Sequence, residues 1–275
     1  MKTLKKSLKI FWKKNLAFFN LAILNNIEYR FNFLIDILIQ PFFTAITEIF
    51  LWSSLFLNSH LTLLNGFTEN SYLSYALWAS FISRITTNWM YEFKMVEEIY
   101  SGSINSLLTR PISFYEYYLS QLLGYKFVTT IGSLGIPIMF CLIFKLPLLM
   151  DRIPLAIVLC FYYLLLVHTI SFIVSILAFY FTKISSFTVA KNLLLWVLMG
   201  ELFPLDLFPE KIKNFVILSP FSSGVYLPVS YLTGRISVQF VYQGFYSVTI
   251  ALILLNFIGY FGWKQALKNY SGTGA

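Results

Sequence analysis

Charged residues are scarce in this chain of 275 residues. Aspartate, glutamate, lysine and arginine make up 12% of it, whereas 58% of the residues are hydrophobic and the mean hydropathy is +0.72. A soluble globular domain has about 25% charged residues, so this composition excludes a surface that faces water on all sides. Several hydrophobic runs reach the ~20 residues that an α-helix needs to cross a bilayer core. The runs do not alternate as barrel strands do, and the sequence therefore predicts an all-α membrane protein.

Residue types that carry enzyme chemistry are also few. The chain has two histidines, His60 and His168, and two cysteines, Cys141 and Cys160, without metal-ligand spacing. It contains no HExxH, GxSxG or phosphate-binding GxxxxGK[ST] motif. We therefore expect no catalytic residue, no metal and no cofactor on this chain. The cysteines are expected to be buried thiols, and His168 a hydrogen-bonded structural residue rather than a proton relay.

Six apolar segments are predicted to cross the membrane. They are residues 31–57, 71–91, 122–144, 155–181, 192–203 and 240–263. Most of the 20 lysines and arginines then fall on one side, which the positive-inside rule makes the cytoplasmic side of both termini. The net charge of +8 follows these span ends rather than one soluble face, so no nucleic-acid partner is expected.

The first 30 residues form a separate predicted unit. They interleave basic and apolar side chains, which is typical of an amphipathic helix lying at the inner membrane surface. A topology signal without such a helix is the open alternative. We accordingly divide the chain into an interfacial helix, 1–30, and a six-span transmembrane domain, 31–275.

Three charged residues fall inside the first two predicted spans: Asp36, Glu48 and Arg84. An unpaired charge at mid-bilayer is unfavourable by about 3 kcal/mol or more, so these residues need partners or water. The two spans are antiparallel neighbours. Arg84 is therefore expected to pair with Glu48 or with Asp36, in a structural role.

The longest polar interruption follows the second span, at residues 92–126. Glu97 and Glu98 suit the start of a short helix, where negative charge interacts favourably with the positive end of the helix dipole. Gly102 is expected to end this helix. The spacing of Ser113 and Glu116 is that of a capping box, which predicts a new helix there. The stretch from 97 to 113 is thus predicted to form a bent pair of short helices, called the elbow below.

The elbow is expected to present apolar side chains to a soluble partner. Ile104, Leu107 and Leu108 are predicted on its surface, in a turn that ends before Arg110 because the residue preceding a proline disfavours α-helix. A plain connecting loop is the alternative that the residues alone leave open.

Residues 200–228, called the outer segment below, are too apolar for a solvated loop. Proline interrupts the segment repeatedly, and a broken backbone at membrane depth must be buried in protein or line a wet cavity. One or two short re-entrant helices are expected, rather than a seventh crossing, which the charges at 210–213 disfavour. The prolines are Pro204, Pro209, Pro220 and Pro228.

Two stretches resemble a known family. YSGSINSLLTRPISFYEYYLSQLLG, at the elbow, and GELFPLDLFPEKIKNFVILSPFSSGVYLPVSYLTGR, at the outer segment, resemble permease subunits of bacterial type-2 ATP-binding-cassette (ABC) exporters. The likeness covers essentially the whole chain. It implies two paired permease subunits, identical or different, in the bacterial inner membrane. It also implies a separate ABC ATPase subunit that binds ATP.

The resemblance also implies residue roles. Residues 96–108 would be the coupling helix, with Glu97, Glu98 and Arg110 as contacts to the ATPase. The outer segment would be a gate that includes Pro204, Asp206, Pro209 and Pro220. The first, second and fifth spans would line the path through the dimer.

Two other functions remain as alternatives to an ATP-driven exporter. A secondary transporter would need ionisable residues at mid-membrane within an inverted repeat, and no repeat is visible. A membrane-embedded enzyme or scaffold is the third reading. The aromatic share of 19% suits lipid contact as well as a hydrophobic cargo, so it does not name a substrate.

Overall fold

The computed structural model describes residues 2–59, 63 and 66–270, and within them the protein is all-helical, which confirms the predicted fold class. His60 and part of the predicted outer loop at 58–70 lie outside the described residues. The helices up to the elbow are α1 (Lys2–Glu28), α2 (Arg30–Leu34), a π-helical turn η1 (Ile35–Ile39), α3 (Gln40–Ser59), α4 (Glu69–Thr86) and α5 (Trp89–Tyr100). Those that follow are α6 (Asn105–Leu108), α7 (Phe114–Ser133), α8 (Gly135–Ile143), α9 (Ile153–Ile176), α10 (Ser185–Met199), α11 (Glu210–Leu218), α12 (Tyr226–Leu232) and α13 (Val238–Asn269).

Four helical segments are long and apolar enough to cross a membrane. They are Arg30–Leu57, Phe114–Ile143, Met150–Phe179 and Val238–Asn269, at the first, third, fourth and sixth predicted spans. The segment at the third predicted span begins at Phe114, eight residues before the predicted boundary at 122. The reason is that the capped helix after the elbow continues into the span without a break. The other two predicted crossings correspond to α4 and α10, so a total of six crossings stays a prediction.

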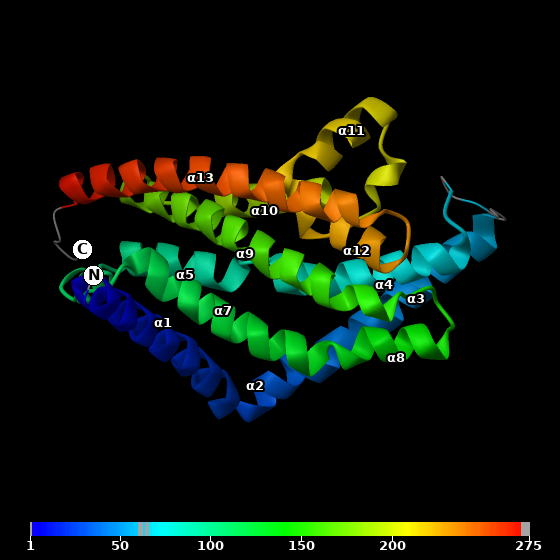
Figure 1. Ribbon diagram of the computed structural model, residues 1–275, viewed down its shortest axis with the longest axis horizontal. Coiled ribbons are helices and arrows are strands. Elements are labelled where there is room, and N and C mark those ends of the chain that lie inside the picture. The colour runs from blue at the N-terminus through cyan, green and yellow to red at the C-terminus, as the bar shows by residue number, and fades with distance from the viewer. Residues whose placement is uncertain (1, 60–62, 64–65, 271–275) are drawn as a thin grey trace.

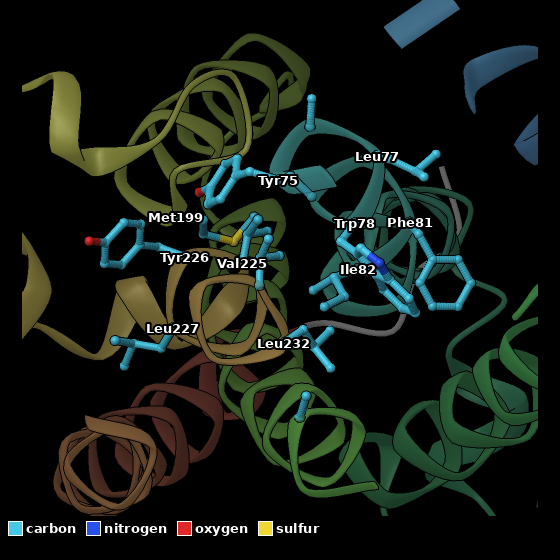
Figure 2. Packing of buried hydrophobic residues seen from close by; sticks show 14 of the residues in the cluster. Tyr75, Leu77, Trp78, Phe81, Ile82, Met199, Val225, Tyr226, Leu227 and Leu232 are labelled. Carbon is cyan, nitrogen blue, oxygen red and sulfur yellow. The ribbon is translucent and has the colours of Figure 1, made fainter. Parts of the chain in front are cut away.

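Helix α4 is too polar to face lipid, and the structure shows why this is tolerated. Most of its side chains are buried, including Tyr75, Trp78 and Ile82. Figure 2 shows these residues packed with Met199 from α10 and with Leu227 and Leu232 from α12. A helix enclosed by protein needs no continuous apolar surface, so α4 forms the centre of the main core. It ends at Thr86, before the predicted boundary at 91, and α5 starts separately at Trp89.

Helix α1 packs along α7, and the two run in the same direction. Lys14 forms a 2.7 Å ion pair with Glu116, and the ring of Phe18 meets that of Tyr117 edge to face. Farther along, the crossing is close at Gly124, where an added Cβ would lie 2.5 Å from the main-chain oxygen of Phe19. The predicted N-terminal helix therefore exists and is attached to the bundle; its position at the membrane surface stays a prediction.

The molecule is elongated, with the elbow at one end. Figure 1 shows the start of α1, the end of α13 and the α5–α7 connection gathered at that end, while α8, α11 and the start of α4 lie toward the other. A second buried cluster holds the elbow end together and includes Met95, Phe114, Tyr118 and Ala266. The elbow and the outer segment are thus separated by the length of the bundle.

Candidate functional site: the elbow, the charged helix contacts and the outer segment

The elbow has the predicted bend. Gly102 adopts a positive φ of 71°, which glycine tolerates without strain, and the short helix α6 follows. Ser113 then caps α7, its hydroxyl accepting a hydrogen bond from the backbone N–H of Glu116. One prediction is wrong here: Glu97 and Glu98 lie in the last turn of α5, not at the start of a helix, because α5 already begins at Trp89.

The elbow surface differs from the predicted one. Ile104 is 0% exposed and Leu107 is also buried, so the expectation that both lie on the surface is wrong. They pack into the second cluster, because α6 folds back onto its own bundle. Leu108 remains 37% exposed, and Glu97 and Arg110 are exposed beside it, whereas Glu98 is half-buried. The surface open to a partner is therefore smaller and more charged than predicted.

A mainly apolar groove adjoins this surface. It has a volume of about 510 Å³ and lies between the end of α5 and the start of α10. Phe93, Tyr100 and Glu97 form one wall, and Lys183 and Thr188 belong to the other. Phe93 and Tyr100 are large exposed side chains, so the groove offers apolar contact area with one charge of each sign at its edges.

A buried ion pair links α5, the helix that leads into the elbow, to the rest of the bundle. Glu92, in the first turn of α5, is fully buried and forms an ion pair with Lys191 of α10. The same carboxylate oxygen accepts a 2.6 Å hydrogen bond from Ser171 of α9. One side chain therefore joins three helices. This pair was not predicted, since Lys191 lies just before the fifth predicted span, 99 residues after Glu92.

The intramembrane charges meet in an arrangement that was only partly predicted. Arg84 does approach Asp36, but it donates a 2.6 Å hydrogen bond to the Asp36 main-chain oxygen rather than forming a carboxylate pair. The Asp36 carboxylate instead accepts from the Tyr125 hydroxyl at 3.1 Å, and Glu48 accepts from the Trp52 indole at 2.8 Å. The predicted ion pair is therefore wrong. Asp36 lies in the π-helical turn η1, where a carbonyl accepts from the N–H five residues on. That residue is Pro41, which has no N–H, so the Asp36 oxygen is open to Arg84.

Helices α3, α4 and α10 enclose a polar groove of about 440 Å³. These helices correspond to the first, second and fifth predicted spans. Glu48, Arg84 and Glu201 are among the lining residues, together with Gln40 and Thr44. Such a concentration of ionisable groups along apolar helices is unfavourable against lipid and is typical of a water-filled path or a subunit contact.

Asp206 organises the outer segment. Its carboxylate forms a 2.5 Å ion pair with Lys213 of α11, lies 3.5 Å from the guanidinium of Arg235, and accepts a hydrogen bond from the Tyr226 hydroxyl of α12. Burial and the nearby Asp206 carboxylate raise the pKa of Tyr226, which keeps that hydroxyl protonated as a donor. Asp206 thereby connects α11 to α12 and to the turn between α12 and α13.

Three of the four prolines of the outer segment stand where an element begins, and the fourth, Pro228, lies in the first turn of α12. Pro204 and Pro209 precede a 3-10 turn and α11, and Pro220 opens the turn η5 (Pro220–Gly224). These positions suit proline because the first N–H groups of a helix have no acceptor within it. The segment contains the two short helices α11 and α12, as predicted; its depth in a membrane stays a prediction.

The predictions for His168 and for the two cysteines are confirmed. His168 is buried and its Nε2 donates to the main-chain oxygen of Tyr115 at 3.1 Å, which is a structural role. Cys141 and Cys160 are free, buried thiols. No cluster of three or more potential metal ligands occurs in the part of the chain that the structure describes.

An all-helical fold with four helices long and apolar enough to cross a bilayer defines an α-helical membrane protein. A family model described as "ABC-2 family transporter protein" matches residues 42–274, and the chain belongs to this family. No curated protein matches the chain in a sequence search. Membership makes the protein a permease of an ABC transporter and implies an ABC ATPase as its partner, and it gives no support to a secondary transporter.

Proposed function

We propose that the protein is the membrane-spanning permease of an ATP-driven exporter in the bacterial inner membrane, with both termini cytoplasmic. A separate ABC ATPase docks at the elbow and binds ATP, and a second permease subunit completes the transport path. The observation that carries this proposal is the elbow itself, which presents Glu97, Leu108 and Arg110 next to an apolar groove.

The buried Glu92–Lys191 pair supports a mechanical connection. Helix α5 leads directly from this pair to the elbow. A movement of the elbow would therefore displace α9 and α10 through the contacts of Glu92 with Ser171 and Lys191. ATP-driven closure of the ATPase would shift α5, and α10 would transmit the shift to the groove with α3 and α4. The transport path would then open on the outer side, below the segment that Asp206 fastens.

Co-purification from membranes tests the docking surface. An ABC ATPase subunit is expected to co-purify with the wild-type protein, and less of it with Glu97→Lys or Arg110→Glu. Lys211→Glu is the matched control, since Lys211 is exposed on α11 at the opposite end. Equal recovery of the ATPase with all variants would overturn the assignment of the elbow.

A further inference from the structure

A cavity of about 220 Å³ lies where α4 ends and α5 begins, against the flank of α7. It is distinct from the groove beside the elbow and from the Asp206 network. It adjoins the groove of α3, α4 and α10, and the residues that line both are Gln40, Arg84, Thr87 and Trp89. Its walls combine two basic residues, Arg84 and Lys126, with the hydrogen-bonding side chains of Asn88, Thr129 and Thr130.

The two basic side chains have no carboxylate partner within 4.0 Å among the described residues. Arg84 donates to the main-chain oxygen of Asp36, and Lys126 donates to the main-chain oxygen of Arg84. Main-chain oxygens carry no full negative charge, so they do not neutralise these cations. The Asp36 carboxylate acts on both basic side chains electrostatically from beyond that distance, and it accepts a hydrogen bond from the Tyr125 hydroxyl.

Several polar groups in the cavity wall lack any partner. Asn88 is 3% exposed, and neither its amide nitrogen nor its amide oxygen has a hydrogen-bond partner. Although Asn88 precedes α5, its side chain does not cap the helix, so the positive end of the α5 dipole also faces this region. Thr130 is 6% exposed, and its hydroxyl is likewise without a partner. Buried polar groups are normally hydrogen-bonded, so the free donors and acceptors of Asn88 and Thr130 indicate a ligand-binding site.

We propose that this cavity binds the anionic, phosphate-type headgroup of a membrane amphiphile. Arg84, Lys126, Thr130 and the Asn88 amide would supply donors to its oxygens, as a helix N-terminus and a guanidinium do in other anion sites. The cavity holds a headgroup and not its chains. Apolar chains can lie outside along α7, where Phe127 and Ile131 are exposed on the helix face next to the cavity-lining residues. This inference goes beyond the transport role, because it assigns a ligand class that coupling to ATP does not require.

Native mass spectrometry of the purified protein in neutral detergent tests the site. Phosphatidylglycerol and phosphatidylcholine with the same acyl chains are added separately, and inorganic phosphate is tested by its effect on thermal unfolding. The wild-type protein is expected to retain phosphatidylglycerol over phosphatidylcholine. Lys126→Met is expected to weaken phosphatidylglycerol binding about tenfold, the equivalent of one charge-assisted hydrogen bond.

Two further variants keep the test decisive if Lys126→Met folds poorly. Thr130→Val preserves shape and breaks no existing hydrogen bond of its hydroxyl, and it should also weaken phosphatidylglycerol binding. Lys264→Met, at an exposed position on α13, should leave phosphatidylglycerol binding unchanged.

Equal retention of both lipids, or unchanged binding by both cavity variants, would overturn the proposal. If inorganic phosphate alone stabilises the protein, and only with Lys126 present, the anion site stands and the lipid source is wrong. Because no ATPase is added, a failure of the proposed coupling cannot produce any of these results.

Discussion

Glu92 shows how one buried side chain can connect a surface element to the interior. Its carboxylate is fully buried, with Lys191 and Ser171 as partners on two other helices. Burial of an ion pair need not add net stability, because desolvation offsets the attraction. Breaking the pair is different, since it leaves an uncompensated charge in a poorly solvated place.

Removing one partner of this pair should therefore destabilise the protein more than removing both. Glu92→Gln alone is expected to lower the free energy of unfolding by about 3–5 kcal/mol, and Glu92→Gln with Lys191→Met by clearly less. Thermal unfolding in detergent measures the effect, and Glu97→Gln, exposed on the same helix, is the control. Additive losses in the double variant would show that the two charges are not coupled.

Some single-residue properties could be predicted from the sequence and others could not. The burial of Cys141, Cys160 and His168 follows from their position in apolar runs, and it was predicted. The Glu92–Lys191 pair joins residues 99 positions apart, which no local pattern reveals. The antiparallel order of the first two spans suggested that Arg84 and Asp36 approach each other. It did not reveal that the contact runs through the Asp36 main-chain oxygen, which is left without a helical N–H partner by Pro41.

Glycine determines how closely α1 approaches α7. At Gly124 an added Cβ would lie 2.5 Å from a main-chain oxygen of α1, which cannot rotate away as a side chain could. Gly124→Ala is expected to destabilise the protein by about 1–3 kcal/mol through overpacking, seen as a lower unfolding temperature.

Gly135→Ala is the matched control for this helix contact. Gly135 lies in α8, close to α7 in the chain, and an added Cβ there meets nothing within 4 Å. Alanine should be neutral or slightly stabilising at this position, because it has the higher helix propensity. Equal losses at both glycines would mean that α1 does not pack on α7 as described.

The outer segment should loosen when Asp206 loses its charge. Asp206→Asn weakens the contacts to Lys213 and Arg235, so the amides of α11 are expected to exchange hydrogen on the order of tenfold faster. Hydrogen–deuterium exchange of peptides covering α11 measures this. Glu210→Gln, exposed at the start of the same helix, should leave the exchange rates unchanged.

The type of each element was more predictable than its boundaries, because hydropathy identifies a long apolar helix but does not mark the residue at which it ends. The long apolar runs gave the four long helices, and Gly102 and Ser113 marked the bend of the elbow. The break between α4 and α5 was missed, because Thr87 and Asn88 interrupt the backbone without a glycine or proline. Ile104 and Leu107 were placed on the surface because an apolar turn in a polar stretch does not say whether its partner is another protein or its own bundle.

At the scale of the whole molecule, the proposed dimer requires a face that is unsuited to lipid. The groove of α3, α4 and α10 places Glu48, Arg84 and Glu201 along one side of the bundle. Helix α13 contrasts with it, since its exposed side chains include Ile250, Ile253, Leu254 and Phe257. We therefore expect the second permease subunit on the side of α3 and lipid on the side of α13.

Cysteine crosslinking in membranes distinguishes the two faces. Both native cysteines are buried, so an introduced cysteine is the accessible thiol among the described residues. Thr44→Cys, in the groove, is expected to give a crosslinked product with a second permease subunit, either another copy of this chain or a co-expressed partner permease carrying the equivalent cysteine. Ile253→Cys, 67% exposed on α13, should stay uncrosslinked because lipid surrounds it. The reverse pattern would place the subunit contact on α13. The charged groove would then have no second subunit to cover it. The proposed transport path between α3, α4 and α10 would have to be abandoned.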